Sequence, residues 1–366
     1  MNIAIIGALT GYGGIQKTAA SLASELSDQN SVVFIDYRGD SEFIFPLPDE
    51  VKIFQTASSK NKGRLMNKGD NIYKIYTSEI KSIIEVLRKE QIDIAIFAAS
   101  FCTALIPIFK SLMPEIKMIA WQHNCFEQYM GLYTEKYHIE YLSGVGCADI
   151  VVSVTKDDAE RFKKYNKNSI CIYNSVSLQN SKIYDINIKR FIFVGRIALE
   201  QKGLDLLLNA FDLVYNTEWQ LNIVGSGEDD TLKELISKTR KCSQINIRGS
   251  KSGEELYHEF KSSSIFIMPS RWEGFGISMI EAMSFGLPVI STPTVGACEI
   301  LCNGEYGLLT ESFSPEDIAN IMQKMIDNGE LRRYFSEQSL KRARDFSVSK
   351  IIPLWNNVLY QIEASK

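Results

Sequence analysis

The chain has 366 residues, of which 45% are hydrophobic and 23% are charged. These fractions are typical of a soluble globular protein and argue against disordered and fibrous classes. Forty basic side chains against forty-four acidic ones give a formal net charge of −4. There is no basic excess of the kind that marks a nucleic-acid binder, so no nucleic-acid partner is expected.

Neither a membrane span nor a secretion signal is expected. The longest charge-free apolar stretch, residues 94–109, is interrupted by Ser100, Thr103 and Pro107 and is too short to cross a bilayer. The opening residues lack a basic segment and a cleavage site, so a cytoplasmic location is predicted. Seven cysteines without a Cys-x-x-Cys motif predict reduced, mostly buried thiols, and three scattered histidines predict no protein-bound metal.

Strand-like and helix-like segments alternate in the first half of the chain, which is the pattern of parallel α/β sheets. Helices are expected between the strands, for example over 71–89 and 155–165. The predicted strands are 3–6, 32–35, 52–54, 94–97, 117–120, 150–152 and 170–172.

The second half repeats this alternation. Its predicted strands are 191–194, 221–224, 245–247, 265–268, 288–290 and 307–309. Its predicted helices are 203–215, 230–239, 254–261, 277–285, 315–328, 331–344 and 349–363.

A polar segment at 179–182 interrupts the rhythm and places a linker at 178–188. We therefore predict two doubly wound α/β domains facing a ligand cleft. The first is 1–178, to which a C-terminal helix at about 349–366 returns, and the second is 188–346.

A glycine-rich turn follows the first predicted strand. Residues Gly11, Gly13 and Gly14 precede a helix that opens near Ile15, so helix amides could face an anion. A dinucleotide fingerprint would need a further glycine where Gln16 stands. A dinucleotide-dependent oxidoreductase, supported by Asp36 at the end of the second strand, and a purely structural turn both stay open as alternatives for this loop.

A pair of carboxylates follows strand 265–268. Glu273 lies in the loop before the helix and Glu281 lies inside it, eight residues further on. Gly274 and Gly276 leave backbone amides open at the helix start, which suits a sugar hydroxyl or a phosphate oxygen. The two carboxylates could accept hydrogen bonds from ribose and hexose hydroxyls. The competing interpretation is a capped helix with one exposed glutamate.

Two cations follow the first strand of the second domain. Gly195 and Arg196 directly follow strand 191–194, and the next helix opens at Lys202 and Gly203. Such a pair could offset the charge of a diphosphate as it leaves. Position alone is equally typical of solvated loop charges.

Taken together, these segments resemble the family 4 glycosyltransferases, which are retaining enzymes of the GT-B fold. The resemblance covers residues 3 to about 363 and is most specific in the second domain. It rests on the motifs Gly13-Gly14-Ile15-Gln16-Lys17, Val194-Gly195-Arg196 with Lys202-Gly203, Glu273-x7-Glu281, 224–228, Asn174, and Gly296 with Glu299. Trp121-Gln122-His123-Asn124 looks like the family's histidine segment, whereas Ala297-Cys298 departs from its pattern.

The resemblance implies a role for each site residue. Arg196 and Lys202 would stabilise the leaving diphosphate, Glu281 would hold the ribose, and Glu273 the donor hexose. His123 would contact the donor sugar beside its anomeric carbon. The implied catalytic residues are Glu273, His123, Arg196 and Lys202, and the implied donor-binding residues are Gly13, Gly14, Gly195, Arg196, Lys202, Gly225, Arg248, Gly249, Glu273, Gly274, Phe275, Gly276, Ile277 and Glu281.

The function implied by the resemblance is hexose transfer with retention, without cofactor or metal. The donor would be a nucleoside-diphosphate sugar, UDP-linked and of galactose or glucose type, and the acceptor a glycan or lipid-linked sugar of cell-surface polysaccharide or lipopolysaccharide. A sugar-nucleotide epimerase of the same fold and a non-catalytic sugar-nucleotide binder stay open as alternatives.

Two clusters of basic residues favour peripheral contact with an anionic membrane at the inner face of the plasma membrane. Each is equally typical of a solvated surface. The clusters are Lys60, Lys62, Arg64 and Lys68, and Arg161, Lys163, Lys164 and Lys167.

Overall fold

The computed structural model describes residues 1–9, 13–38, 45–56, 67, 69–178, 185–215 and 218–364. The chain forms two compact units. Unit 1 comprises Met1–Ser175 and Val348–Lys366, and unit 2 comprises Val176–Ser347. The first boundary therefore precedes Val176, a few residues ahead of the predicted linker, whose segment 179–184 lies outside the described residues.

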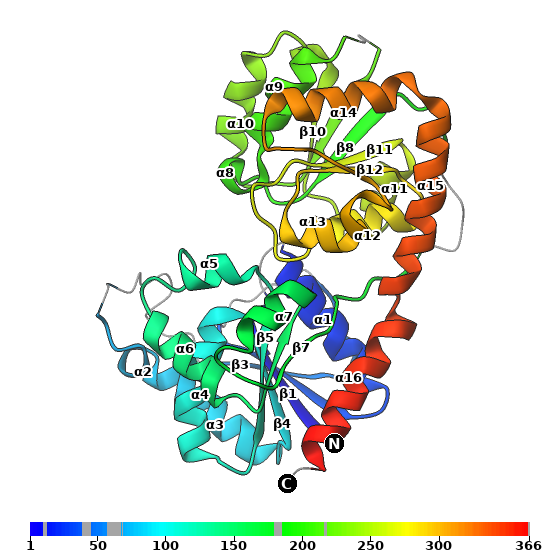
Figure 1. The fold of residues 1–366 in the computed structure, drawn as a ribbon. Helices are drawn as coiled ribbons and strands as arrows, with labels where there is room; N and C mark the ends of the chain where they lie inside the picture. Colours follow the sequence, from blue (N-terminus) through cyan, green and yellow to red (C-terminus); the bar gives the residue numbers. More distant parts are fainter. Residues whose placement is uncertain are drawn as a thin grey trace. The chain divides into compact units, whose positions relative to one another are not determined.

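Unit 1 contains a parallel sheet of seven strands in the order β3-β2-β1-β4-β5-β6-β7 (Figure 1). The strand order reverses between β1 and β4, and such a reversal opens a crevice at the carboxyl ends of the strands. The strands are β1 (Asn2–Gly7), β2 (Ser31–Asp36), β3 (Lys52–Gln55), β4 (Ile94–Ala98), β5 (Lys117–Gln122), β6 (Ile150–Ser153) and β7 (Ser169–Cys171).

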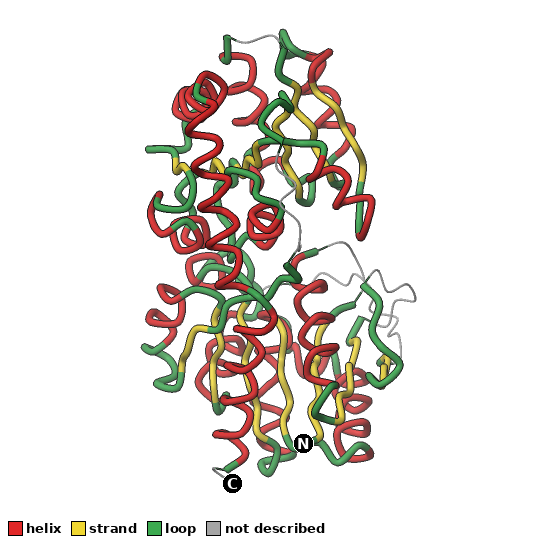
Figure 2. Tube along the Cα trace, turned by 90° about the vertical axis from the view of Figure 1, so that its right-hand side faces the viewer, coloured by secondary structure: helices red, strands yellow, loops and turns green. Residues whose placement is uncertain are grey.

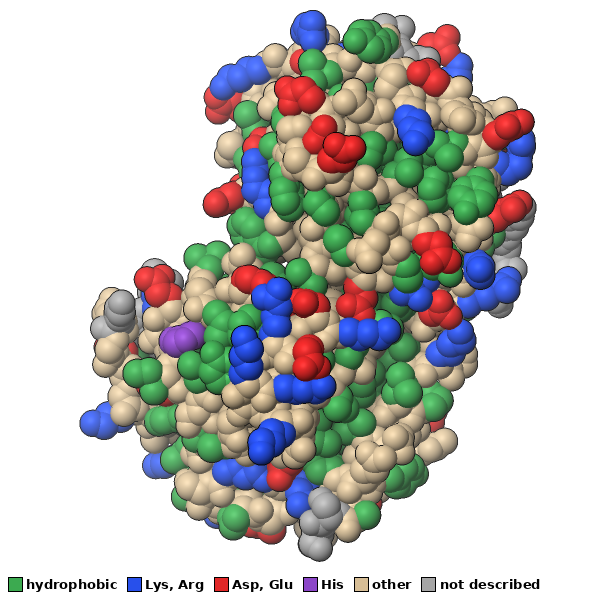
Figure 3. Space-filling view, in the orientation of Figure 1, with side chains coloured by type: hydrophobic (Ala, Val, Ile, Leu, Met, Phe, Trp, Pro, Cys, Tyr) green, Lys and Arg blue, Asp and Glu red, His purple; other side chains and the backbone are tan. Residues whose placement is uncertain are grey.

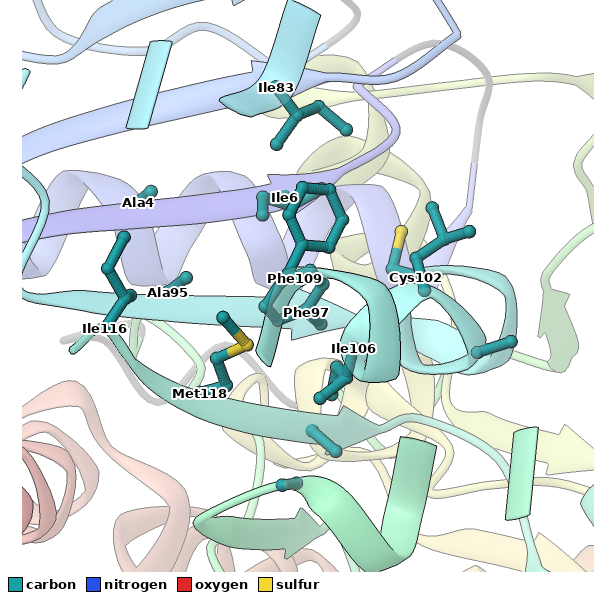
Figure 4. Close-up of a cluster of buried hydrophobic side chains, with 14 of the residues drawn as sticks. Ala4, Ile6, Ile83, Ala95, Phe97, Cys102, Ile106, Phe109, Ile116 and Met118 are labelled. Atoms are coloured by element: carbon teal, nitrogen blue, oxygen red, sulfur yellow. The ribbon is translucent and has the colours of Figure 1, made fainter. Parts of the chain in front are cut away.

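Helices cover both faces of this sheet because side chains alternate along its buried strands. In β1, Ala4 and Ile6 join a core that includes side chains of α3, α4 and α6 (Figure 4). Ile3 and Ile5 join the opposite core, which contains side chains of α1 and α16. The helices of unit 1 are α1 (Gly14–Ser27), α2 (Ile72–Ile75), α3 (Thr77–Lys89), α4 (Ala99–Leu112), α5 (Phe126–Met130), α6 (His138–Cys147), α7 (Lys156–Phe162) and α16 (Val348–Glu363).

The last helix of the chain, α16, completes the second of these cores. Its Trp355 is buried and meets Trp121 of β5 edge-on, with ring centroids 5.1 Å apart. Figure 2 shows α16 running beside the strands of unit 1. The helix predicted at 349–363 therefore packs on the sheet, through buried residues that include Ile351, Leu359 and Ile362.

One segment of unit 1 differs from the sequence-based expectation, and a second confirms it. The single helix expected over 71–89 is divided at Tyr76, whose φ of −102° and ψ of 27° separate α2 from α3. The apolar stretch 94–109 is strand β4 followed directly by α4, and the junction is Ala99, with φ +74°. No helix in the described part of the chain is long and apolar enough to cross a membrane.

Unit 2 contains a second parallel sheet, in the order β10-β9-β8-β11-β12-β13, which reverses between β8 and β11. Its strands are β8 (Arg190–Val194), β9 (Gln220–Val224), β10 (Ile245–Gly249), β11 (Ile265–Met268), β12 (Val289–Ser291) and β13 (Leu308–Leu309). Its helices are α8 (Leu199–Lys202), α9 (Leu204–Leu213), α10 (Asp229–Ser237), α11 (Gly253–Lys261), α12 (Ile277–Ser284), α13 (Val295–Ile300), α14 (Pro315–Asp327) and α15 (Gly329–Ala343).

The two faces of the second sheet also differ. Phe191, Leu221 and Ile265 face a core formed with α9 and α14. Asn222, next in β9, instead donates to Glu259 of α11, so α11 lies on the opposite face. On that side the ring of Phe260 stacks against Phe285 at the end of α12, with centroids 5.2 Å apart.

All seven cysteines are free thiols. Only Cys102 and Cys125 are buried, and Cys147 and Cys242 are exposed, so the expectation of mostly buried thiols is wrong. Both exposed cysteines lie at the ends of short elements, Cys147 at the last residue of α6 and Cys242 in a single 3-10 turn, Cys242–Gln244.

Candidate active site

The predicted cations and carboxylates of unit 2 follow the two strands that flank the reversal of its sheet. Gly195 and Arg196 follow β8, and Glu273 follows β11. These two strands are hydrogen-bonded neighbours and run parallel, with Phe191 opposite Ile265. Their carboxyl ends therefore meet at one edge of the sheet, the place where open α/β sheets bind ligands.

Lys202 and Glu273 form an ion pair at this edge. Lys202 Nζ lies 2.5 Å from Glu273 Oε1, and Ser270 donates its hydroxyl to the same oxygen over 2.6 Å. The side chains of Lys202 and Glu273 are only 16% and 8% exposed. Each charge thus compensates the other in a poorly solvated environment, where electrostatic interactions are stronger than in water.

The loops that carry these two residues are fastened together. Gly203 adopts φ +62°, and a Cβ there would lie 2.1 Å from the carbonyl oxygen of Pro269. Arg271 donates two hydrogen bonds to the carboxylate of Asp205, at 2.8 and 2.7 Å, and its backbone N–H donates to Gln201 O over 2.8 Å. The loop after β11 is therefore fixed against the segment after β8.

Arg196 is exposed beside this pair, and its Nη2 donates to Gln201 Oε1 over 2.8 Å. Next to Arg196, the ends of β8, β9 and β10 approach one another closely at glycine residues, through backbone atoms. Gly225 has φ +149°, a Cβ there would lie 1.8 Å from Gly195 O, and its N–H donates to Gly249 O over 2.9 Å. Glycine backbone of this kind allows a ligand to approach the main chain closely.

Arg248 is placed differently from the other donor-site candidates. Its Nε donates to Glu259 of α11 over 2.8 Å, so its side chain is engaged on the α11 face of the sheet. Of the two donor-site candidates on β10, Arg248 and Gly249, only Gly249 lies at the strand's last position, where its backbone can take part in the site.

The amino end of α12 supplies backbone amides to the same edge. Gly276 caps the helix with φ +101°, no side chain caps it, and Ile277 is its first residue. Gly274 and Phe275, just before it, are buried, and Glu281 is half-buried one turn into the helix. A helix start without a side-chain cap favours an anion such as phosphate.

His123 lies in unit 1, directly after β5. Its ring is 4.1 Å from that of Trp121, and its backbone N–H donates to the Tyr129 hydroxyl over 3.0 Å. The side chain is buried, and neither ring nitrogen has a hydrogen-bond partner within the described residues. Burial lowers the pKa of His123 to about 3, so the imidazole is neutral at physiological pH and can exchange a hydrogen bond with a hydroxyl.

A buried carboxylate secures the turn that follows His123. Asp158 Oδ1 accepts from Phe126 N over 2.7 Å, and its Oδ2 accepts from the Thr155 hydroxyl over 2.5 Å. Burial raises the pKa of Asp158 to about 6. Reasoning from the sequence missed Asp158, Ser270 and the Arg271–Asp205 pair, because each acts through partners that only the fold brings near.

The predicted glycine loop and the basic clusters are only partly described. Gly13 is extended backbone at the cap of α1 and Gly14 is the first residue of that helix, while Gly11 lies outside the described residues. The described residues also do not include the first basic cluster, which is Lys60, Lys62, Arg64 and Lys68.

The second basic cluster is partly neutralised by its neighbours. Arg161 pairs with Glu127 and with Asp157, and Lys163 pairs with Glu160. Figure 3 shows basic side chains interspersed with acidic ones over this face. In the ranges that the structure describes, no group of three or more His, Cys, Asp or Glu side chains could hold a metal ion.

Two doubly wound parallel sheets in one chain are the architecture of the GT-B fold, and solved structures of GT-B proteins match it. The lipopolysaccharide outer core galactosyltransferase WaaB superposes with a TM-score of 0.77 at 19% identity, over 99% of each chain. The Anabaena protein HepE, solved in complex with UDP-glucose, gives 0.76 at 16% identity, over 99% of this chain and 100% of its own.

The family follows from sequence comparison. Residues 180–342 match the model of the group 1 glycosyl transferases. An uncharacterized glycosyltransferase of Methanocaldococcus jannaschii is 32% identical over 299 residues, covering 68% of this chain and 72% of its own. One from Haemophilus influenzae is 29% identical over 360 residues, 95% and 96% of the two chains. The amylovoran biosynthesis glycosyltransferase AmsD of Erwinia amylovora is 24% identical over 369 residues, 97% and 98% of the two chains. The chain belongs to the group 1 glycosyltransferases, which decides against the oxidoreductase alternative.

Proposed function

We propose that this glycosyltransferase moves a hexose of galactose or glucose type from a UDP-linked donor to a glycan or lipid-linked acceptor, in the assembly of a cell-surface polysaccharide or lipopolysaccharide. The observation that carries the proposal is the Lys202–Glu273 pair beside Arg196 and the start of α12, at the reversal of the second sheet. Support for the process comes from AmsD, a relative assigned to amylovoran biosynthesis. Support for the donor comes from WaaB and HepE, the latter solved with UDP-glucose.

Each charge of the site has a task in this reaction. The diphosphate would lie against Arg196, Lys202 and the amides of α12, whose positive charge stabilises it as it leaves. Lys202 would turn from Glu273 to the phosphate, which frees the Glu273 carboxylate to accept hydrogen bonds from the hexose. Glu281 would accept from the ribose hydroxyls. Because these groups supply positive charge themselves, the proposal includes metal independence. It also includes retention of the anomeric configuration, which the resemblance to the family 4 enzymes implies.

The neutral imidazole of His123 is assigned a hydrogen bond to a sugar hydroxyl, since both its ring nitrogens are buried without a described partner. If the acceptor is lipid-linked, we propose in addition that the protein makes a peripheral, salt-sensitive contact with an anionic membrane. Lys164 and Lys167, both exposed, would contribute to it.

A transfer assay tests the proposal. The full chain is incubated with UDP- and GDP-hexoses and a lipid-linked acceptor fraction, with and without EDTA, and the product's anomeric configuration is read by NMR. We expect transfer from a UDP-hexose, retention, and activity that survives EDTA. Lys202→Met should lose most turnover, while Lys233→Met, on the exposed surface of α10, should keep it. An inverted product, loss with EDTA, or release of a free epimer without acceptor would contradict the proposal.

A further inference from the structure

A polar cavity of about 190 Å³ lies in unit 2, between the sheet and the end of α11. We call it the arginine pocket. Arg190 and Gln220 are the first residues of β8 and β9, so the pocket reaches the amino ends of these strands, opposite to the edge that carries Lys202 and Glu273. Its lining residues are Arg190, Gln220, Asn222, Asn246, Arg248, His258 and Ser262.

The lining is polar at positions where a sheet face normally packs on apolar side chains. Arg190 lies opposite Gln220, and Asn222 lies opposite Asn246 in neighbouring strands. On the other face of the same strands, Phe191 and Leu221 belong to the hydrophobic core. The pocket is thus a hydrophilic strip on the face that α11 only partly covers.

Hydrogen bonds hold this strip in place around one buried carboxylate. Glu259, 2% exposed, accepts from Asn222 Nδ2 over 3.1 Å and from Arg248 Nε over 2.8 Å. Asn246 donates to Asn222 Oδ1 over 3.2 Å. Both carboxylate oxygens are therefore engaged, and the amides and Arg248 are oriented before any ligand arrives.

Arg190 is oriented from the other end of the pocket. Its Nη1 donates to Ser262 O over 2.8 Å and its Nη2 to Gln220 Oε1 over 3.1 Å. Its Nε is buried without a hydrogen-bond partner in the described part of the chain. An unpaired buried donor of this kind lowers the stability of the unliganded protein.

Donors remain in excess after these bonds are made. Within the described ranges the Nη nitrogens of Arg248, whose side chain is 46% exposed, and the ring of His258 form no hydrogen bond. Glu259 pairs with Arg248, whereas Arg190 donates only to the uncharged groups Ser262 O and Gln220 Oε1, so its positive charge is uncompensated among the pocket residues. A ligand that matches such a set is a compact anion with several acceptor oxygens, and guanidinium groups fit phosphate well.

We propose that the arginine pocket binds a phosphate group, free or as the monoester of a small sugar phosphate, at a site separate from the donor edge. Arg190 and Arg248 supply the charge, and Gln220 and His258 supply further donors at the rim. Phosphate binding in the arginine pocket does not depend on the proposed transfer reaction.

Calorimetric titration of the full chain with inorganic phosphate and with glucose 6-phosphate tests the site at constant ionic strength. We expect saturable binding of at least one probe. Tighter binding of the ester identifies a sugar phosphate as the occupant, and equal affinity identifies the free ion; both outcomes support the site.

Two variants keep the test independent of folding. Gln220 is exposed, so Gln220→Glu places a carboxylate in the pocket and should weaken binding by about tenfold or more. Thr231→Glu adds the same charge on the exposed face of α10 and should leave binding unchanged.

A third variant locates the bound ion. Binding should persist in Arg196→Gln, a substitution of an exposed side chain at the donor edge. Absence of saturable binding to the wild type, equal binding by Gln220→Glu, or loss of binding in Arg196→Gln would each overturn the proposal.

Discussion

Replacing Lys202 by Met removes the ammonium group that compensates Glu273 but keeps a side chain of similar length. Glu273 would then remain 8% exposed, with only the Ser270 hydroxyl among its described partners donating to its Oε1. A carboxylate in such a place must be solvated by rearrangement or take up a proton, and either response lowers the free energy of unfolding.

The geometry sets the size of the effect. Opposite charges 2.5 Å apart attract by about 7 kcal/mol at an effective dielectric constant of about 20. Desolvation of the two groups offsets part of this attraction, and breaking a buried pair from one side costs about 3–5 kcal/mol. For a unit of this size the melting temperature should fall by roughly 6–20 °C.

A double-mutant cycle with Glu273→Gln isolates the pair. Unfolding is induced with guanidinium chloride and followed by hydrogen exchange in β8 and β11. We expect a coupling energy of about 2 kcal/mol or more and a double variant more stable than Lys202→Met alone. Lys233→Met, which breaks an exposed pair with Asp230, should cost less than about 1 kcal/mol. Strictly additive effects, or a Lys202→Met protein as stable as the wild type, would show that the ion pair does not stabilise unit 2.

Three further predictions concern backbone, pH and the histidine. Gly203→Ala should destabilise unit 2 by about 3 kcal/mol or more in denaturant melts, because its Cβ would meet Pro269 O at 2.1 Å. Gly249→Ala, at a similar φ of +69° but with open space, should cost only about 1–2 kcal/mol, and equal losses would contradict the steric argument. The pKa of Asp158 is raised from 3.8 to about 6, so the native carboxyl keeps its proton while the unfolded one ionises. The free energy of unfolding should therefore fall by about 2 kcal/mol from pH 4 to pH 6, and Asp158→Asn should remove that slope; an unchanged slope would exclude Asp158 as its source. His123→Phe should abolish transfer yet leave the melting temperature equal or higher, since it removes two unpaired buried nitrogens, and an active variant would exclude the role assigned to the histidine.

The alternation of apolar and amphipathic segments was enough to predict both sheets, because buried parallel strands are short apolar runs between helices. It predicted strand 94–97 with a helix after it in one apolar run, but not the residue at which the strand gives way to the helix. Residues 94–109 contain the junction of β4 and α4, and the turn at Ala99 has no glycine or proline to mark it. Helix α5 was missed for another reason, since its first residue, Phe126, is held by Asp158 from a later helix.

The candidate site was predictable only residue by residue. Lys202 and Glu273 each follow a strand end, which the sequence shows, but their direct contact spans 71 positions along the chain. The orientation of Arg248 toward Glu259 depends on the packing of α11 and leaves no mark in the local sequence. Motifs therefore indicated which residues belong to the strand edge, and only the fold shows what each side chain contacts.

Binding of a nucleoside diphosphate where β8 and β11 end can be measured by calorimetric titration of UDP into the wild type and into Arg196→Gln, a substitution of an exposed side chain. Loss of a charge-assisted hydrogen bond worth about 1.5–3 kcal/mol predicts saturable binding to the wild type that weakens by about 10- to 150-fold in the variant. If UDP does not bind the wild type, or binds both proteins equally, the account of the site is wrong.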